Sequence, residues 1–318
     1  MLSFFSKGYP QKIWEKAYFL KQKMQGFPKM HAFFYQNHGY KLDLKQPFTH
    51  NQRIVHKMIM DRSPLIRITS DKVRVKEYVK EMLGEKLSDE ILIPQFFVSK
   101  TGKDIPFATW DFEFFMKANH GSGFNKLVRP GDDLQEVERL ATYWLSQSFG
   151  QSRHEWAYRD IPRRIICEKV LRTPEGEIPA DIKYYCFNGV PKMVLVLKNR
   201  FDNQKRVFVD ENLNLLEGSQ MYGNDVLWPL PPMPNHSRML DLAARLAQPF
   251  TYCRVDFYSI GDRVYLGEIT HYSGAGAEKF DDYDLDVAFG HLWKPENKHR
   301  NVLEILSEIK DGASRRIT

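Results

Sequence analysis

The chain has 318 residues, of which 42% are hydrophobic and 27% charged, a balance that is ordinary for a globular protein and argues against intrinsic disorder. A formal net charge of +6 suits anionic partners such as nucleotide phosphates, an acidic polysaccharide or a membrane face, although good solubility alone also explains it. The three cysteines are too widely spaced for a zinc knuckle, no apolar run is long enough to span a bilayer, and residues 1–8 lack the apolar stretch of a signal peptide. We therefore expect a cytoplasmic protein with at most peripheral membrane contact. The charge also suits nucleic acid, but the motifs described below do not lead us to expect a nucleic-acid partner.

The first 69 residues predict a helical N-terminal segment. Residues 10–25 carry apolar side chains at helical spacing with lysines between them, and Gly26 and Pro28 end that pattern. A short aromatic helix and a helix over 49–61 follow. The lysines and rings of this segment also allow a second interpretation, a basic binding surface for nucleic acid or membrane, but an amphipathic helix docked on a catalytic lobe is the more common outcome of such patterning.

Residues 70–163 predict a first α+β lobe. Ser70 or Asp71 is placed to cap a helix that ends at Gly84. Residues 91–98 read as a pair of short strands and 111–117 as another strand, which runs into a turn of small residues at 118–123. Residues 134–149 are strongly amphipathic and predict a helix.

Residues 164–318 predict a second lobe dominated by antiparallel strands. The Asn188-Gly189 pair is typical of a tight hairpin turn. We expect strands at 164–171, 182–187, 192–198 and 206–210, a helix at 239–246, and a last hairpin formed by 253–258 and 263–269. The whole chain therefore predicts an α+β fold with antiparallel sheets.

The last hairpin carries the chemistry that is easiest to derive from the sequence. Strand residues two apart share a face, so Arg254 and Asp256 are expected to lie beside Glu268 and Thr270 of the partner strand. Two carboxylates that converge repel each other unless a cation lies between them, and Mg²⁺ prefers hard oxygen ligands. The alternative is a solvated hairpin face with ordinary ion pairs.

Two further segments suggest a nucleotide. Lys117 directly precedes the Gly121-Ser122-Gly123 turn, whose backbone N–H groups can approach phosphate oxygens, although a flexible turn is the common alternative. The apolar strand that ends at Glu168 can offer main-chain hydrogen bonds to an adenine edge, and an acid shortly afterwards can accept ribose hydroxyls. Taken alone, that strand is only a strand with a charged end.

The order of these motifs resembles the ATP-grasp superfamily in the layout of the D-alanine–D-alanine ligases. It resembles most closely the TupA-like family, which is named for teichuronopeptide biosynthesis. The runs that carry the resemblance are SDKVRVKEYV at 70–79, KANHGSG at 117–123, DIKYYCFNG at 181–189, RVDFY at 254–258 and GEIT at 267–270. The resemblance implies an ATP-grasp fold: two α+β lobes whose antiparallel sheets clasp ATP, preceded here by the short helical segment.

The resemblance also implies a role for each matching residue. ATP and Mg²⁺ would be the cofactors, and Arg254 and Lys117 the catalytic residues, with Arg254 stabilising the developing negative charge. The implied metal ligands are Asp256, Glu268 and Thr270. The implied nucleotide contacts are Lys72 and Lys117 on the α- and β-phosphates, Gly121, Ser122 and Gly123 over the triphosphate, Glu168, Lys169 and Leu171 around adenine, Glu175 or Glu177 on ribose, and Lys183 as a further contact.

The chain departs from the family in two places. Thr270 stands where many relatives have Asn, which weakens the case for a second metal ion. The segment before residue 70 is short and helical, unlike the N-terminal domain of the larger ligases, so we expect the acceptor site to be built differently.

The activity implied is ATP-dependent ligation of a carboxylate and an amine through an acylphosphate. The TupA-like resemblance points to a sugar acid of a cell-surface polysaccharide or its nucleotide-sugar precursor as the carboxylate, and to a nascent anionic polysaccharide as a partner. An ATP-grasp kinase that phosphorylates a hydroxyl remains an alternative, because the same lysines and metal would serve it. A polysaccharide-biosynthesis glycosyltransferase is a further alternative, which the motif order does not favour. Arg200 is a candidate for binding an acidic substrate.

Overall fold

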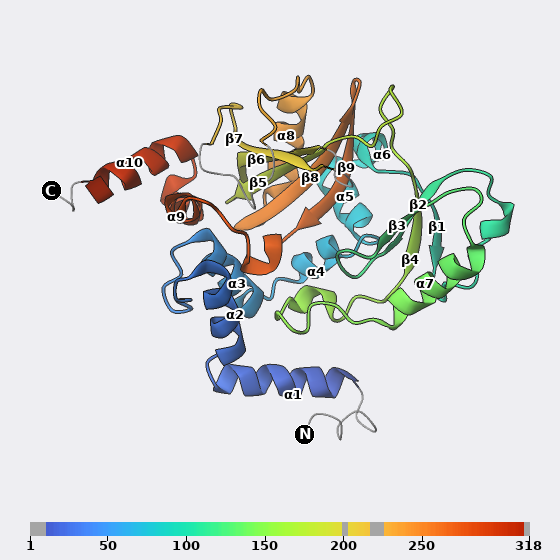
Figure 1. The fold of residues 1–318 in the computed structure, drawn as a ribbon, viewed down its shortest axis with the longest axis horizontal. Helices are drawn as coiled ribbons and strands as arrows, with labels where there is room; N and C mark the ends of the chain where they lie inside the picture. Colours follow the sequence, from blue (N-terminus) through green and yellow to red (C-terminus); the bar gives the residue numbers. More distant parts are fainter. Residues whose placement is uncertain (1–10, 199–202, 217–225, 315–318) are drawn as a thin grey trace.

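The computed structural model describes residues 11–198, 203–216 and 226–314 and shows two antiparallel sheets with helices around them (Figure 1). A four-stranded sheet has the order β1-β4-β2-β3, and a five-stranded sheet has the order β7-β6-β5-β8-β9. The α+β prediction is therefore confirmed. The 3₁₀ turns are η1 (Phe107–Thr109), η2 (Trp156–Tyr158), η3 (Ser273–Gly276) and η4 (Pro295–Asn297).

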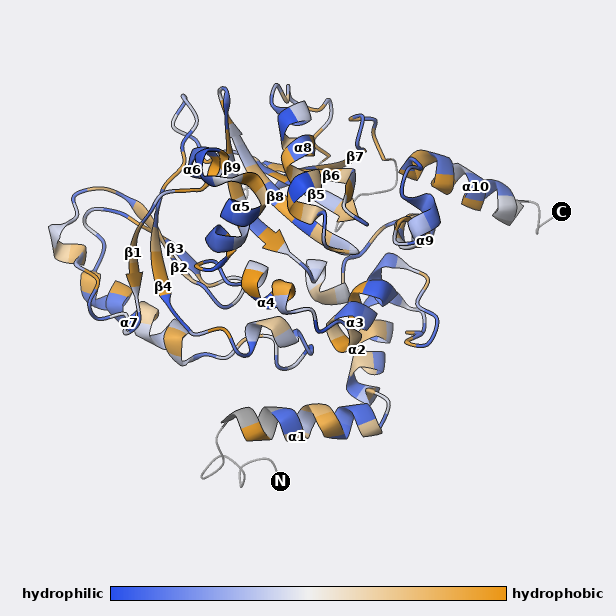
Figure 2. Ribbon diagram, turned by 180° about the vertical axis from the view of Figure 1, so that it is seen from behind, coloured by the Kyte–Doolittle hydropathy of each residue, from blue (hydrophilic) through white to orange (hydrophobic). Residues whose placement is uncertain are grey.

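The N-terminal segment is helical, as the sequence predicted. Its helices are α1 (Gln11–Met24), α2 (Pro28–His38), α3 (His50–Met60) and α4 (Pro64–Ser70). A capping box starts α3: the backbone N–H of Gln52 donates to Thr49 Oγ1 at 3.2 Å, and that of Thr49 donates to Gln52 Oε1 at 3.3 Å. Figure 2 shows polar and apolar turns mixed along α1, which lies below the two sheets and leads into α2.

The helix expected to begin at Ser70 or Asp71 begins later. Helix α4 ends at Ser70, and the backbone N–H of Val73 donates to Asp71 Oδ1 at 2.9 Å, so Asp71 forms a turn before α5 (Val75–Leu83). Gly84, with φ 82°, ends α5 as predicted and leads into α6 (Glu85–Ile91). That helix was not predicted, and it occupies the start of the apolar run read as a strand pair. A short apolar run does not distinguish a strand from a buried helix end.

The four-stranded sheet consists of β1 (Gln95–Ser99), β2 (Phe114–Ala118), β3 (Asn125–Val128) and β4 (Ile165–Lys169). Helix α7 (Leu134–Ser146), capped by Asp133, packs Val137, Ala141 and Trp144 against it. Strand β3 was missed because it has only four residues beside the glycine turn. Strand β4 begins at the boundary expected at residue 164 but pairs with β1 and β2, so we propose that the first lobe extends to Lys169.

The five-stranded sheet consists of β5 (Asp181–Phe187), β6 (Val190–Lys198), β7 (Lys205–Asp210), β8 (Tyr252–Ile260) and β9 (Arg263–Thr270). The predicted hairpin turn joins β5 and β6, with φ 50° at Asn188 and 78° at Gly189. Helix α8 (His236–Ala247) packs on β5, β6 and β8. Helices α9 (Tyr283–Leu292) and α10 (Val302–Ser314) follow; the sequence reading did not include them. The N-terminal helices join this lobe, because α3 packs against α9 and η3.

The two lobes meet along a narrow apolar seam. Leu92, just before β1, bridges to Leu266 of β9, and Ile93, Leu171 and Tyr265 form a small buried cluster beside it. Two cavities lie between the sheets beside this seam.

Candidate nucleotide and metal site

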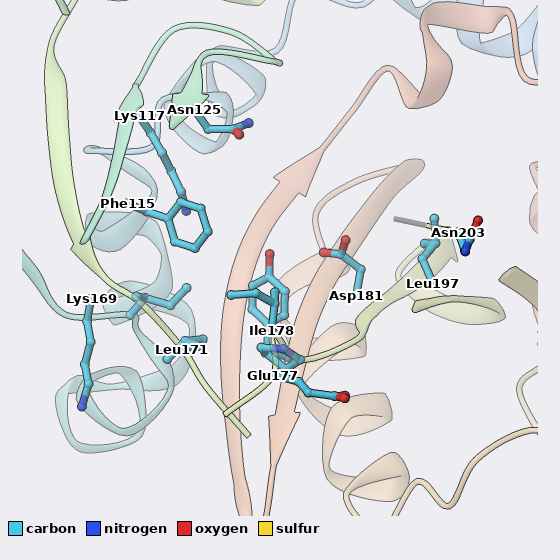
Figure 3. Close-up of a pocket in the computed structure, with 13 residues that line it drawn as sticks. Phe115, Lys117, Asn125, Lys169, Leu171, Glu177, Ile178, Asp181, Leu197 and Asn203 are labelled. Atoms are coloured by element: carbon cyan, nitrogen blue, oxygen red, sulfur yellow. The ribbon is translucent and has the colours of Figure 1, made fainter. Parts of the chain in front are cut away.

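An apolar pocket of about 420 Å³ lies between the two sheets (Figure 3). Figure 3 shows Phe115 and Lys117 on one side, and Asp181 and Leu197 on the other. Its other lining residues are Ile93, Asn125, Lys169, Leu171, Glu177, Ile178, Pro179, Asn203 and Tyr258. A slot of this kind, with apolar walls and strand ends at its rim, fits a flat base.

The structure separates the residues predicted around adenine and ribose. Lys169 and Leu171 line the apolar pocket, whereas Glu168 points to the other face of β4. There Glu168 accepts hydrogen bonds from Lys117 Nζ at 2.6 Å and from Gln95 Nε2 at 3.0 Å. Burial acts to raise the pKa of Glu168, but the neighbouring charge of Lys117 and the hydrogen bonds lower it overall. Glu168 is thus suited to holding Lys117 in place.

The two candidate ribose acids differ in position. Glu177 lines the apolar pocket, whereas Glu175 lies on an exposed turn and is absent from the pocket wall. Arg200 lies outside the described residues.

A smaller, polar cavity of about 70 Å³ adjoins the apolar pocket. The two cavities share Lys117, Asn125, Asp181 and Tyr258 in their walls. The other lining residues are Lys72, Gly121, Ser122, Gly123, Phe124, Lys183, Asp256, Gly267 and Glu268. The lysines, the glycine turn and the carboxylates that the sequence analysis singled out therefore converge on one cavity from both sheets.

The glycine turn is fixed at its base and closely packed at its tip. Asn119 donates to Asp71 Oδ1 at 2.8 Å and accepts from the backbone N–H of Arg164 at 2.7 Å. Lys72 Nζ donates to the carbonyl oxygen of Gly121 at 2.5 Å, and burial lowers the pKa of this lysine. A Cβ on Gly121 would lie 2.8 Å from the ring of Phe149, so only glycine fits without movement.

The carboxylates of the last hairpin lie on one face, as the strand alternation predicted. Asp256 and Glu268 are directly paired residues of β8 and β9, and Val255, Phe257 and Ile269 are buried behind them. Arg254 joins the two acids: its Nε and Nη2 lie 2.7 Å from Asp256 Oδ1 and Oδ2, and Nη2 lies 3.3 Å from Glu268 Oε1.

Asp256 is held as an anion by two cations. Lys183 Nζ donates to Asp256 Oδ2 at 2.7 Å, in addition to the contacts from Arg254. Burial acts to raise the pKa of Asp256, which is only 3% exposed, but the charges of Arg254 and Lys183 and their hydrogen bonds lower it to about 2. Glu268 is more accessible, with 41% of its side chain exposed.

The donor set at this hairpin fits Mg²⁺. Two carboxylates and the hydroxyl of Thr270 are hard oxygen donors, and Thr270 Oγ1 lies 3.3 Å from Arg254 Nη2. In the described part of the chain, no group of three or more His, Cys, Asp or Glu side chains is arranged as a metal site. Two protein carboxylates suit an ion that takes its remaining ligands from phosphate and water.

A large cleft of about 1500 Å³ opens on the far side of the polar cavity. The two share Glu268 and the 121–123 turn in their walls, and the cleft is also lined by Arg254, Thr270 and Tyr272. Its outer wall comes from α1 and the start of α2, with Tyr18, Lys21 and Lys29, and from the 148–155 loop. The three spaces therefore follow one another: an apolar pocket, a charged cavity and an open cleft.

Sequence reasoning missed several residues of this site. Gln95 and Phe149 act through contacts between segments that are far apart in the chain, and no local pattern marks them. Glu155 lies in a loop with no periodicity. The hairpin, by contrast, was marked by alternation within a single strand pair.

A sequence profile of the family described as TupA-like ATPgrasp matches residues 50–294. The chain belongs to this family. The resemblance noted in the sequence is thus confirmed, and with it the ATP-grasp fold. No curated protein sequence matches the chain.

Solved ATP-grasp proteins are similar in fold to this TupA-like chain at low sequence identity. D-alanine–D-alanine ligase from Bacillus anthracis complexed with ATP is 14% identical, with 65% of this chain and 57% of that chain covered and a TM-score of 0.41. VanG D-Ala:D-Ser ligase from Enterococcus faecalis is 11% identical, with 75% and 62% covered and a TM-score of 0.44. The ADP complex of N5-carboxyaminoimidazole ribonucleotide synthetase is 11% identical, with 66% and 46% covered and a TM-score of 0.42. The chain thus spans about half to two thirds of these proteins.

No helix in the described residues of this family member has the length and apolar character needed to cross a bilayer.

Proposed function

We propose that this TupA-like protein is an ATP-dependent carboxylate–amine ligase. The observation that carries the proposal is the sequence of three connected spaces: the apolar pocket for adenine, the polar cavity for phosphates and the large cleft for the acceptors. Lys72, Lys117 and Lys183 bring three cations to the middle space, where a triphosphate tail needs neutralisation.

The residues of the chain then have the following roles. Leu171 and Phe115 would pack on the base, and Glu177 is the candidate acceptor for ribose hydroxyls. Lys117, held by Glu168, and Lys72 would bind phosphate oxygens. Lys72 now donates to Gly121, so a phosphate that attracts this lysine would also change the contact that holds the glycine turn.

Asp256 and Glu268, with the Thr270 hydroxyl, would hold Mg²⁺. When bound, the ion supplies Lewis-acid polarisation of the phosphates and a template for in-line transfer. Arg254 must then share Asp256 with the ion, and its freed N–H groups can face the transferred phosphoryl group.

The reaction proposed has two steps. A carboxylate oxygen of the first substrate attacks the γ-phosphorus of ATP, and ADP leaves, which gives an acylphosphate. The amine nitrogen then attacks the acyl carbon, the carbon–oxygen bond to phosphate breaks, and inorganic phosphate leaves. The protein contributes mainly positioning and charge neutralisation.

We propose a sugar acid as the carboxylate, either in a cell-surface polysaccharide or in its nucleotide-sugar precursor. Lys21, Lys29 and Arg153 bring positive charge to the cleft wall, which suits an anionic acceptor. The size of the cleft suits a substrate larger than a single amino acid. A nascent anionic polysaccharide and a cytoplasmic location are part of the same proposal.

The test is a reaction of the purified protein with Mg-ATP, a set of carboxylates (glucuronate, galacturonate and UDP-glucuronate) and a set of amines (glycine, L-alanine and ethanolamine). We expect ADP and phosphate together with a product whose mass is the sum of both substrates less one water. A phosphorylated product that is stable and needs no amine would instead identify a kinase. Release of a nucleoside diphosphate from UDP-glucuronate without ATP would identify a glycosyltransferase.

A further inference from the structure

Glu155 is a buried acid in the wall of the large cleft, outside the nucleotide and metal residues described above. It is 8% exposed, and it shares the cleft with Arg254 and Glu268. In the described residues its carboxylate has no hydrogen bond or ion pair, and neither carboxylate oxygen is among the fully enclosed side-chain atoms that lack a partner. The carboxylate oxygens are therefore open to the cleft, where water or a donor group of the substrate can reach them.

The loop around Glu155 fixes the backbone from which this side chain projects. Glu155 is the residue before η2, whose Trp156 and Ala157 are buried. Gly150 packs so closely that a Cβ there would lie 2.5 Å from the carbonyl oxygen of Glu155. Gly150 has φ 78°, a conformation that suits glycine. The backbone and Cβ of Glu155 are therefore fixed by the fold.

The surroundings of Glu155 place its pKa near neutral pH. Burial raises the pKa of Glu155 to about 7, against a smaller lowering by the Arg153 guanidinium. Tyr158 and Tyr272, which lie nearest on η2 and after β9, have pKa values raised by burial and stay neutral. Arg254 and Glu268 face the same space from β8 and β9, and Lys21 and Lys29 from α1 and α2.

We propose that Glu155 is the catalytic base that receives the incoming amine and takes its proton; this rests on the ligase function proposed above. The carboxylate accepts one proton from the substrate ammonium group and passes it to solvent. The neutral nitrogen attacks the acyl carbon, a second nitrogen proton leaves with the phosphate, and the amide retains the third. Protons and charge balance with no further reactant.

Hydroxylamine separates this role from the ATP-dependent half of the reaction. It is already neutral at pH 7 and traps an acylphosphate as a hydroxamate without needing a base. In Glu155→Gln we expect amide formation with the amine that wild type uses best to fall about 100-fold or more, with hydroxamate formation within about twofold of wild type. The rise of the wild-type amide rate through about pH 7 should also disappear. Glu136→Gln, on the exposed first turn of α7, is the matched control.

Equal loss of amide and hydroxamate would show a structural role and overturn the proposal, as would an amide rate within about threefold of wild type. If wild type forms no hydroxamate with any of the carboxylates named above, the ligase function itself fails. A second measurement then still decides on Glu155: NMR of protein labelled at the glutamate carboxyl carbon. We expect one signal that titrates near pH 7, is missing in Glu155→Gln, and moves when glycine, L-alanine or ethanolamine is added. A signal that none of these amines moves contradicts the proposal.

Discussion

Asp256 and Glu155 are both buried carboxylic acids, yet the structure gives them opposite properties. Asp256 receives hydrogen bonds from Arg254 and Lys183, and its pKa falls to about 2. Glu155 receives none from the described residues, and burial raises its pKa to about 7. Burial alone therefore does not decide the charge of an acid; its partners do. The pair offers one acid that is always an anion, as a metal ligand must be, and one that exchanges a proton near neutral pH.

The largest effect is expected from neutralising Asp256. Asp256→Asn removes the charge that would hold Mg²⁺, and we expect ATP-dependent turnover to fall by about 1000-fold or more. The measurement is ADP release at saturating Mg-ATP, with circular dichroism to confirm folding. Asp262→Asn, in the exposed turn of the same hairpin, should keep full activity. Retained turnover in Asp256→Asn would show that this carboxylate does not hold the metal, whereas a binding protein would release no ADP even as wild type.

The two acids should also have opposite effects on stability. The pKa of folded Glu155 lies above its ordinary value of 4.5, so ionising it costs stability as the pH rises from about 4.5 through 7. At pH 8, Glu155→Gln should therefore have a higher urea midpoint than wild type and a free energy of unfolding that is greater by up to about 3 kcal/mol. At pH 4 the two proteins should differ little.

Asp256 gives the reverse case. Its folded pKa lies below 3.8, so its contribution to stability is present above that pH and is lost as the pH falls toward 2.

For Glu155, equal urea midpoints of wild type and Glu155→Gln at pH 8 would show that burial does not raise the pKa of this acid.

A smaller effect is expected at the glycine turn, which closes both the polar cavity and the cleft. Gly121→Ala places a methyl group 2.8 Å from the Phe149 ring, so we expect the KM for ATP to rise about tenfold. Phe149→Leu in the same chain should recover part of that loss. Gly123→Ala is a useful comparison, because its Cβ would meet no atom within 4 Å but its φ of 81° is strained. No recovery in the double variant would exclude the ring as the cause.

The smallest effect tests whether the charge of Arg153 lowers the pKa of Glu155. Arg153 lowers the pKa of Glu155 slightly, so Arg153→Ala should raise that pKa and move the rise in amide rate to higher pH by a few tenths of a unit. Because Arg153 is exposed, high salt should move the wild-type profile in the same direction. A shift to lower pH would contradict this assignment.

The sequence alone could predict the surroundings of Asp256 but not those of Glu155. The face shared by Asp256 and Glu268 was predictable because strand alternation and a short hairpin turn fix it locally. The order of motifs was enough for the family and the fold. The turn at Asp71 was not predictable, because Asn119, nearly fifty residues later, fixes it by a hydrogen bond. The contact between Gly121 and Phe149, and the position of Glu155 in the cleft, likewise depend on tertiary packing.

The most direct test is a crystal structure with a non-hydrolysable ATP analogue and Mn²⁺ in place of Mg²⁺, read from the anomalous signal of the metal. We expect the metal peak between the β8 and β9 acids, the base against Leu171, and the guanidinium of Arg254 moved away from at least one oxygen of Asp256. A nucleotide bound elsewhere, or a metal peak away from that hairpin with the Arg254 contacts unchanged, would contradict the account.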